Sequence, residues 1–395
     1  MGGATENDSA SVWFLQRAQS GDVVVLRATG TDGYNDYFYN QLGQSLNSVE
    51  TLLLNDSSAA YEPYVIQRIA EAEALFFAGG NQWTYVREWR NTPLDSAVRY
   101  IQSQRNAAVG GTSAGMAILG GIYNTAENGS LTSTEALSDP FHPNSTLDSA
   151  LFVAPEPLKG ILTDTHFDNP DRRGRLISWM ARVWVDRNAN QPVFPVYAIA
   201  CEEYTAVCIE PGGWARVFGD APTYDDKAWF FTTNCGLLPD AGPERCTPGQ
   251  TLDWVRNQQA LLAYTVEGTL AGNRGFDLND WKTGTGGQWT RFWVSNGQLQ
   301  SAAAVAPDCT FGEAEAALNA VELRVYAEPD GSFSWSYSEE LHSGLQLELY
   351  DARGARLDET DASSGRIGAH LEPGLYTLRM EHQGRSGWVK LWLPH

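Results

Sequence analysis

The sequence predicts an α/β protein: a doubly wound, mostly parallel sheet, followed by a small all-β sandwich domain at the carboxyl end. In the first part of the chain, short apolar runs alternate with helix-compatible stretches, which is typical of βαβ units. From Val321 onward, runs with period-two alternation are separated by turn residues, which is typical of a β-sandwich. The composition shifts near Pro307, so we expect one domain over residues 1–306 and another over residues 318–395.

The strands and helices of the first domain follow from its hydrophobic pattern. Three short runs, Val23–Leu26, Thr51–Leu54 and Ala74–Phe77, are apolar enough to be buried parallel strands. The stretches Tyr64–Ala70 and Trp83–Arg90 between and after them have the composition of helices. This order predicts consecutive strand–helix–strand units.

A glycine-rich stretch, Gly110–Gly115, follows a fourth apolar run and precedes a helix-compatible one. A serine between small residues at a strand-to-helix turn is typical of a nucleophile elbow, and Ser113 occupies that position. Such a turn aims the next backbone N–H, that of Ala114, at a developing oxyanion. The alternative is a glycine-rich loop that a serine caps. The motif alone does not decide between the two, and a catalytic role requires that the rest of the chain supply a base for the serine.

Two histidines are candidates for that base, because only His142 and His166 of the six in the chain precede residue 340. His142 lies in a proline-flanked loop. His166 ends the apolar run Gly160–Phe167, which predicts a buried strand whose carboxyl end lies where open α/β sheets keep their chemistry. We therefore favour His166 as the base and keep His142 as the alternative.

An acidic residue should orient the histidine. Two strand-like runs, Val193–Ala200 and Thr205–Ile209, flank Glu202 and Glu203, which predicts that the two acids occupy a hairpin turn. These residues by themselves do not choose between Glu202 and Glu203.

Four segments, in this order, resemble the cyanophycinase-like serine peptidases, which are relatives of the aspartyl dipeptidase peptidase E. The resemblance covers residues 2–300, and it rests on Phe76–Gln82, Gly111–Gly115, Asp164–Phe167 with Arg172–Leu176, and Glu202–Ala206. It implies a fold similar to that of class I glutamine amidotransferases. It also favours Glu203 as the acid of a Ser113–His166–Glu203 triad.

The resemblance further implies how a substrate is held. Backbone N–H groups of Gly80, Asn81 and Ala114 would form the oxyanion hole. Substrate groups would be bound by Gln82, Asp164, Thr165, Arg172 and Arg175. We expect residues 171–184 to be helical, which would place the two arginines on one face as a carboxylate clamp. This chemistry needs neither a metal nor an organic cofactor.

The implied reaction is hydrolysis of cyanophycin, a poly-aspartate that carries arginine on its side chains, to β-Asp-Arg dipeptides. Thr165 and Pro170 depart from the family pattern, which makes a dipeptidase or isoaspartyl-type peptidase acting on short Asp-containing peptides the second hypothesis. A non-catalytic binding or adhesion protein on a hydrolase scaffold is the third.

The first residues also depart from the pattern. The pair Gly2–Gly3 stands where the first strand of the family normally ends. We therefore expect a secreted or periplasmic protein whose natural N-terminus, with any signal peptide, has been trimmed or mis-started.

Composition limits the partners. The 395 residues carry a formal net charge of −21, which argues against nucleic acid, because phosphate binding needs basic patches. The negative charge would attract a basic substrate through long-range steering, and it is equally explained by a need for solubility in salty surroundings. No segment approaches the roughly 20 apolar residues that cross a bilayer. We expect a peptide or polymer substrate and no membrane partner; whether the protein is a homodimer stays open.

Two cysteine pairs are close in sequence, Cys201 with Cys208 and Cys235 with Cys246, while Cys309 is left over. Such spacing is typical of disulfides in a secreted protein, and isolated buried thiols are the alternative.

The remaining expectations concern the end of the chain. We expect a helix over Trp254–Gln259 and edge strands of the first domain over Leu261–Val266 and Arg291–Val294. In the second domain the clearest strands are Leu345–Tyr350, Leu375–Met380 and Trp388–Trp392. That domain has no plausible catalytic set, so adhesion to an insoluble substrate, sorting and stabilisation are all open roles.

Overall fold

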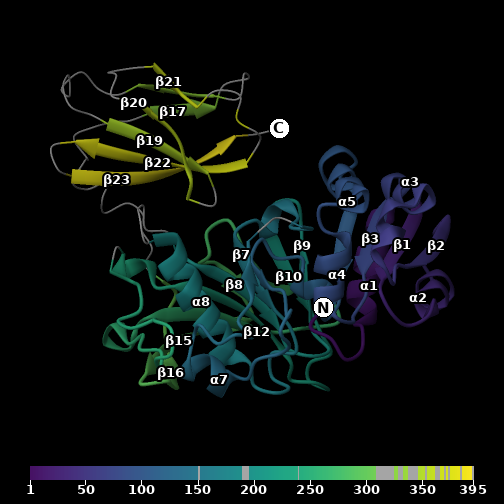
Figure 1. Cartoon of the computed structure of the whole chain (residues 1–395), viewed down its shortest axis with the longest axis horizontal. Helices are drawn as coiled ribbons and strands as arrows, with labels where there is room; N and C mark the ends of the chain where they lie inside the picture. Colours follow the sequence, from purple (N-terminus) through teal and green to yellow (C-terminus); the bar gives the residue numbers. More distant parts are fainter. Residues whose placement is uncertain are drawn as a thin grey trace. The chain divides into compact units, whose positions relative to one another are not determined.

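The chain forms two compact units in the computed structural model (Figure 1). The first comprises Met1–Ala189 and Pro195–Pro307, and the second comprises Asn190–Phe194 and Asp308–His395. The structure describes residues 1–149, 152–188, 195–238, 240–307, 324–327, 332–336, 346–351, 354–360, 365–368, 371, 374–382 and 385–393.

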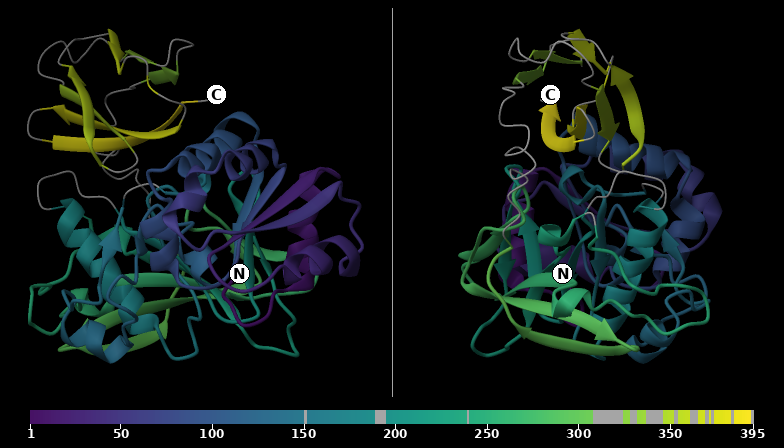
Figure 2. Two further views of the ribbon diagram at one scale, coloured as in Figure 1. Left: turned by 45° about the vertical axis from the view of Figure 1, so that its right-hand side comes forward. Right: turned by 90° about the vertical axis from the view of Figure 1, so that its left-hand side faces the viewer.

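The first sheet contains four parallel strands. They are β1 (Asp22–Arg27), β2 (Ser48–Leu53), β3 (Ala74–Phe77) and β4 (Ala108–Gly111), in the order β2-β1-β3-β4. Figure 2 shows them side by side as the purple-to-blue strands of the first unit. Each of the three apolar runs predicted as strands overlaps one of them.

Helices cover both faces of this sheet because its side chains alternate between two cores. Val24 and Leu26 pack into one core, and Val23 and Val25 into the other. Figure 1 labels these helices and the strands β1, β2 and β3. The helices are α1 (Asp8–Leu15), α2 (Gly33–Asp36), α3 (Pro63–Glu71), α4 (Gln82–Trp89) and α5 (Pro93–Gln104). The predicted helices Tyr64–Ala70 and Trp83–Arg90 correspond to α3 and α4.

A second sheet has six strands. Its order is β16-β15-β12-β11-β8-β7, with only β7 and β8 parallel. The strands are β7 (Ile161–Asp164), β8 (Tyr197–Cys201), β11 (Lys227–Thr233), β12 (Leu261–Glu267), β15 (Gly287–Ser295) and β16 (Gln298–Ala303). Helix α8 (Arg173–Asn188) lies between β7 and β8 in sequence and agrees with the helix expected over residues 171–184. The strands expected at the edge, β12 and β15, each have a neighbour on both sides, so that expectation was wrong.

A third sheet explains why the expected hairpin is absent. Its order is β14-β13-β10-β9, with β9 (Ala206–Ile209), β10 (Trp214–Phe218), β13 (Arg274–Asp277) and β14 (Gly284–Thr285). Since β8 and β9 belong to different sheets, Glu202 and Glu203 link two sheets and do not close a hairpin. The helix expected over Trp254–Gln259 is also wrong: only Arg256–Gln258 form a 3₁₀ turn, in which Asn257 is left-handed.

Shorter elements complete the first unit. They are β5 (Tyr123–Asn124), β6 (Leu147–Asp148), α6 (Ala114–Ala117) and α7 (Ser133–Ser138). Helix α7 begins with a capping box, in which Thr132 and Glu135 satisfy each other's backbone N–H groups. Across the described ranges, no helix is long and apolar enough to cross a membrane.

The cysteines do not pair as expected. Cys201, Cys208 and Cys246 are buried free thiols, so neither short-range pair forms. Cys201 and Cys208 pack into different cores, which is why closeness in sequence does not bring their sulfur atoms together. Cys235 is disulfide-bonded, and Cys309 lies outside the described residues.

The second unit is rich in strands. One sheet has the order β17-β18-β21 and the other β20-β19-β22-β23. Side chains of both sheets, among them Trp335 on β18 and Leu349 on β19, share one core. The three predicted strands overlap β19, β22 and β23. The bounds are β17 (Arg324–Ala327), β18 (Phe333–Ser336), β19 (Gln346–Asp351), β20 (Arg356–Thr360), β21 (Gly365–Ile367), β22 (Gly374–His382) and β23 (Arg385–Leu393).

Candidate active site

Ser113 occupies a strained turn between β4 and α6. Its backbone has φ 52° and ψ −119°, a conformation that residues other than glycine rarely adopt. Its neighbours must be small: a Cβ atom on Gly115 would lie 2.0 Å from the Phe77 carbonyl oxygen. The two flanking glycines noted in the sequence are thus required by the close approach of α6 to β3 and β4.

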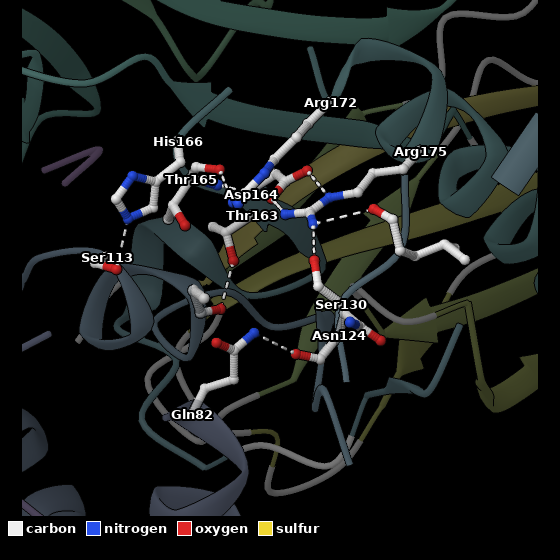
Figure 3. Close-up of polar contacts among 12 residues, drawn as sticks. Gln82, Ser113, Asn124, Ser130, Thr163, Asp164, Thr165, His166, Arg172 and Arg175 are labelled. Carbon is white, nitrogen blue, oxygen red and sulfur yellow. Dashed lines mark hydrogen bonds and ion pairs between the residues drawn. The ribbon is translucent and has the colours of Figure 1, made fainter. Parts of the chain in front are cut away.

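His166 reaches this serine from the end of β7. Its Nε2 lies 2.7 Å from the Ser113 Oγ, and its Nδ1 lies 2.6 Å from the Glu203 Oε1 (Figure 3 shows the first contact). The side chains of His166 and Glu203 are 23% and 17% exposed, so the pair is sheltered but open to a ligand on one side. Glu203 also accepts a hydrogen bond from the Asn169 Nδ2 at 3.4 Å.

The structure distinguishes the alternative acid, Glu202, and the alternative base, His142, from the residues that contact each other at Ser113. Glu202 points away from His166: its carboxylate accepts hydrogen bonds from the Trp229 indole and the Lys227 backbone N–H, both at 2.8 Å. Burial raises the pKa of Glu202 to about 7. His142 takes part in a local turn, where its Nδ1 accepts from the Asn144 N–H at 3.1 Å.

The loop that follows β3 lies against the serine. A Cβ atom on Gly79 would lie 3.4 Å from the Ser113 Cβ. Asn81 caps α4 by accepting the Trp83 N–H at 3.0 Å, which fixes the loop. Among the described residues, the Ala114 N–H has no hydrogen-bond acceptor. Gly79 and Ala114 are therefore the residues of these two segments that adjoin Ser113, and the expected oxyanion hole of Gly80, Asn81 and Ala114 stays a prediction.

The first three residues are also part of this site, which the sequence analysis missed. The Met1 carbonyl oxygen accepts from the Ser113 N–H at 3.1 Å, and that of Gly2 accepts from the His166 N–H at 3.0 Å. Gly3 has φ +124°, and a Cβ atom there would lie 2.2 Å from the His166 ring. The adjacent pair of glycines was the available signal, because such close approach to an imidazole excludes any side chain.

Two of the expected substrate-binding residues are partners of each other. Arg175 on α8 donates from Nε to the Asp164 Oδ2 at 3.0 Å and from Nη2 to the Asp164 Oδ1. Its Nη1 donates to the Ser130 Oγ at 3.2 Å (Figure 3). Asp164 and Arg175 are 2% and 6% exposed, so this bidentate ion pair is buried. Both charges are neutralised within the protein.

The other expected substrate-binding residues form fewer hydrogen bonds within the protein. Arg172 donates from Nη1 to the Thr165 carbonyl oxygen at 2.8 Å, while its buried Nε has no hydrogen-bond partner. Burial, reinforced by the nearby Arg175, lowers the pKa of Arg172. Gln82 donates from its amide to the Asn124 carbonyl oxygen at 3.2 Å. Thr165 is buried, with its N–H bonded to the Asp164 carboxylate.

Three carboxylates, those of Asp168, Glu202 and Asp226, lie next to Glu203, and their oxygens approach within 4.8 Å of one another. Burial and the charge of Asp168 raise the pKa of Asp226 to about 6. Acidic groups commonly lie this close together without an ion. We assign this cluster no metal.

The first part of the chain is similar in sequence to known peptidases. Residues 4–139, which include Ser113, match the model of peptidase family S51. The chain is 27% identical over 186 residues to a cyanophycinase of Synechococcus elongatus and 26% identical over 171 residues to one of Trichormus variabilis; these spans are 47% and 43% of this chain. The first part of the chain is thus similar to cyanophycinases and to peptidase family S51.

The similarity to this family is partial. The matched span covers 50% of each of these cyanophycinases, so the comparison reaches about half the length of the curated relatives. A crystal structure of a peptidase from an acI-B1 actinobacterium covers 56% of this chain and 83% of its own, with 14% identity and a TM-score of 0.38.

Proposed function

We propose that this protein is a serine-type peptidase that uses Ser113, His166 and Glu203 as a catalytic triad. The observation that supports this most is the unbroken chain of contacts from Ser113 Oγ to His166 Nε2 and from His166 Nδ1 to Glu203 Oε1, at 2.7 and 2.6 Å. A serine hydroxyl is a weak nucleophile unless an adjacent base accepts its proton. The strained turn at Ser113 fits the role of a nucleophile elbow.

The proposed reaction is acyl transfer in two steps. The Ser113 Oγ attacks a carbonyl carbon of the substrate as its proton passes to His166 Nε2. The Glu203 carboxylate stabilises the resulting imidazolium, and the N–H groups of Ala114 and Gly80 stabilise the oxyanion. His166 then protonates the leaving amine, and water, activated by the same histidine, releases the acyl product. The residues so assigned need no metal or cofactor for these steps.

For the substrate we propose cyanophycin, cleaved to β-Asp-Arg dipeptides. The matched cyanophycinases and the acidic net charge of −21, which would steer a basic polymer, support this choice. Arg172 is the proposed carboxylate-binding group, since its guanidinium donates from Nη1 to the Thr165 carbonyl oxygen and has no carboxylate partner among the described residues. Gln82 and Thr165 are the other proposed substrate-binding residues. Asp164 and Arg175 would position this pocket through their ion pair, and need not touch the substrate.

Incubation of the purified protein with cyanophycin tests this proposal, with the product masses measured. We expect a dipeptide of aspartate and arginine from the wild type and none from Ser113→Ala. Intact polymer with the wild type, together with cleavage of short Asp-containing peptides, would replace cyanophycin by the dipeptidase or isoaspartyl-type alternative. The mutual pairing of Asp164 and Arg175 favours this second candidate, because it leaves fewer free charges to recognise an arginine-bearing polymer.

Three finer points belong to the same proposal. The first unit would have the doubly wound fold of class I glutamine amidotransferases, with a catalytic domain over residues 1–306. The second unit would be an accessory β-sandwich over residues 318–395. The protein would act outside the cytoplasm, in the periplasm or the medium, on a peptide or polymer substrate.

A further inference from the structure

Glu202 is a buried carboxyl group that the proposed mechanism does not use. It directly precedes Glu203 in the link between β8 and β9, and it is 9% exposed. Its Oε1 accepts the Trp229 indole N–H at 2.8 Å, and its Oε2 accepts the Lys227 backbone N–H at 2.8 Å. The Glu202 N–H itself donates to the Lys227 carbonyl oxygen at 3.0 Å. Three hydrogen bonds therefore fasten this end of the link to the start of β11.

The segment that follows β7 and carries His166 contacts the same link. The Phe167 N–H donates to the Cys201 carbonyl oxygen at 3.2 Å. The Asp168 carboxylate accepts the Glu203 N–H at 3.3 Å. The position of the Asp168 carboxylate therefore affects the position of Glu203, the acid of the proposed triad.

The Glu202 carboxyl lies close to two more acidic groups. Its oxygens and those of Asp168 and Asp226 lie within 4.8 Å of one another. The other charged groups around these three are Arg172 and Arg173 from the segment after β7, Glu203 from the link, and Asp225 and Lys227 from the start of β11 and the turn before it. Two cations thus come from one side and one from the other, against five carboxyl groups.

A proton decides whether these three groups attract or repel one another. An ionised carboxylate only accepts hydrogen bonds, whereas a protonated carboxyl can also donate one to a neighbouring carboxylate. Burial raises the pKa of Glu202 to about 7, and burial together with the charge of Asp168 raises that of Asp226 to about 6. Of these two groups, Glu202 keeps its proton to the higher pH.

We propose that Glu202 is a positioning residue, whose protonated carboxyl bonds to Asp168 and so holds the Glu203 link against the segment that carries His166. The inference rests on the proposed function, because Glu203 is the acid of the proposed triad. Loss of the proton leaves like charges at close range, which moves Asp168 away from the Glu203 N–H and loosens Glu203. A triad without such a group gives a turnover that rises with pH and then stays level, because the histidine base works in its neutral form.

Three variants of the full chain test this role. Glu202→Gln is neutral at every pH, and its amide can donate to Asp168 as the protonated carboxyl does. Asp226→Asn removes one charge of the cluster and keeps Glu202. Asp225→Asn is the matched control, because it removes an exposed charge of the same turn that lies outside the cluster. The kcat and KM for a small activated ester are measured from about pH 5.5 to about pH 9.

We expect the kcat of the wild type and of Asp225→Asn to fall at least about threefold between roughly pH 7 and 9, with KM nearly constant, because Glu202 does not contact the substrate. Glu202→Gln should keep a level kcat over this range. Asp226→Asn should show a smaller fall, because fewer like charges remain. A constant kcat in the wild type, or an equal fall in the wild type and in either cluster variant, would overturn the proposal.

Hydrogen exchange separates this inference from the proposed function. Exchange of a peptide that spans residues 200–206 is compared between Ser113→Ala and Ser113→Ala with Glu202→Gln, in pairs at the same pH. We expect equal exchange at about pH 6, and at about pH 8.5 exchange at least about fivefold faster in the protein that keeps Glu202. Equal exchange at both pH values would overturn the proposal even where Ser113 is the nucleophile. Normal turnover by Ser113→Ala would instead refute the proposed triad, whatever the result of the exchange comparison.

Discussion

Asp164 and His166 are two positions apart at the end of β7, yet their side chains lie in different environments. His166 points toward Ser113 and is 23% exposed at its side chain. Asp164 points toward Arg175 and is buried. Figure 3 shows the two sets of contacts on either side of Thr165. One side of this strand end carries the candidate chemistry, and the other side carries an ion pair that binds α8 to β7.

This difference shows how a charged residue that forms a structural ion pair near an active site can be mistaken for a substrate-binding residue. The same sequence block supplies both groups, and Asp164, His166 and the two arginines in it resemble the functional set of cyanophycinase-like peptidases, whereas Thr165 departs from it. The structure divides them by whether their charge is already satisfied. Arg175 has a bidentate carboxylate partner, whereas the buried Nε of Arg172 has none. A guanidinium without a carboxylate partner in the protein is the better candidate to bind a substrate carboxylate.

The largest expected effect is on the His166 side. Ser113→Ala and His166→Ala should each lower kcat by at least about 10³-fold, and the double variant should be little worse, because the two residues act as a unit. His142→Ala serves as the matched control and should keep normal turnover. Steady-state kinetics with a peptide substrate measure all four variants. If His142→Ala were inactive and His166→Ala active, the assignment of the base would be wrong.

Variants of Arg175 and Arg172 separate the structural ion pair from the proposed substrate-binding group. Arg175→Ala leaves a buried carboxylate unpaired and should lower the free energy of unfolding by about 3–5 kcal/mol. The double variant Asp164→Leu with Arg175→Met removes both charges and should recover most of that loss. Arg172→Ala should leave stability nearly unchanged.

The same variants separate the arginines kinetically. Arg172→Ala should lower kcat/KM for a carboxylate-bearing peptide by about 1.5–3 kcal/mol, as expected for a charge-assisted hydrogen bond. Hydrolysis of a small activated ester without carboxylates should barely change. Urea unfolding and kinetics on both substrates are the measurements. Equal losses on the two substrates would mean that Arg172 supports the structure and does not contact substrate.

Glu202 provides a pH-dependent contrast with its neighbour Glu203. Burial raises the pKa of Glu202 from 4.5 to about 7 in the folded state, so folding favours its protonated form. Its contribution to stability is therefore complete below about pH 4.5 and is lost as the pH rises through 7, by an amount on the order of 1–3 kcal/mol. Glu202→Gln should flatten the pH dependence of the free energy of unfolding between pH 4.5 and 7. An unchanged slope would show that another group titrates there.

The smallest effect concerns the second unit. A chain that ends after Phe311 keeps all five cysteines and all residues of the proposed site. Because that site lies within the first unit, we expect turnover of a small ester within about twofold of the full chain's value. A folded but inactive fragment, with folding checked by circular dichroism, would mean that the second unit shapes the active site.

Much of the fold could be predicted because it is encoded locally. The apolar runs that became β1 and β3 are continuous and buried, and that of β2 is continuous although its Leu53 is exposed. The glycines around Ser113 mark a tight turn in the sequence, although the atom that excludes a side chain at Gly115 is the Phe77 carbonyl oxygen of β3. The errors concern non-local pairing. Nothing in the residues around Glu202 shows that β8 and β9 join different sheets, or that Cys201 and Cys208 enter different cores.

The candidate site was predictable to the same degree. Ser113 and His166 were found from turn chemistry and from the scarcity of histidine. The Asp164–Arg175 pair was not, because the two residues are eleven positions apart, across the end of β7 and the first turn of α8. The contacts of Gly2 and Gly3 are with residues more than a hundred positions away, so the adjacent glycines signalled a close approach without showing which residue approaches them.

The most direct test of the central claim is covalent labelling of the nucleophile. The folded wild type is treated with a fluorophosphonate, and the modified residue is identified by peptide mass spectrometry. We predict one adduct, on Ser113, and a labelling rate at least about 10³-fold lower in His166→Ala, because the serine then lacks its base. Absence of the adduct from the folded wild type, or equal labelling in His166→Ala, would contradict the proposed triad.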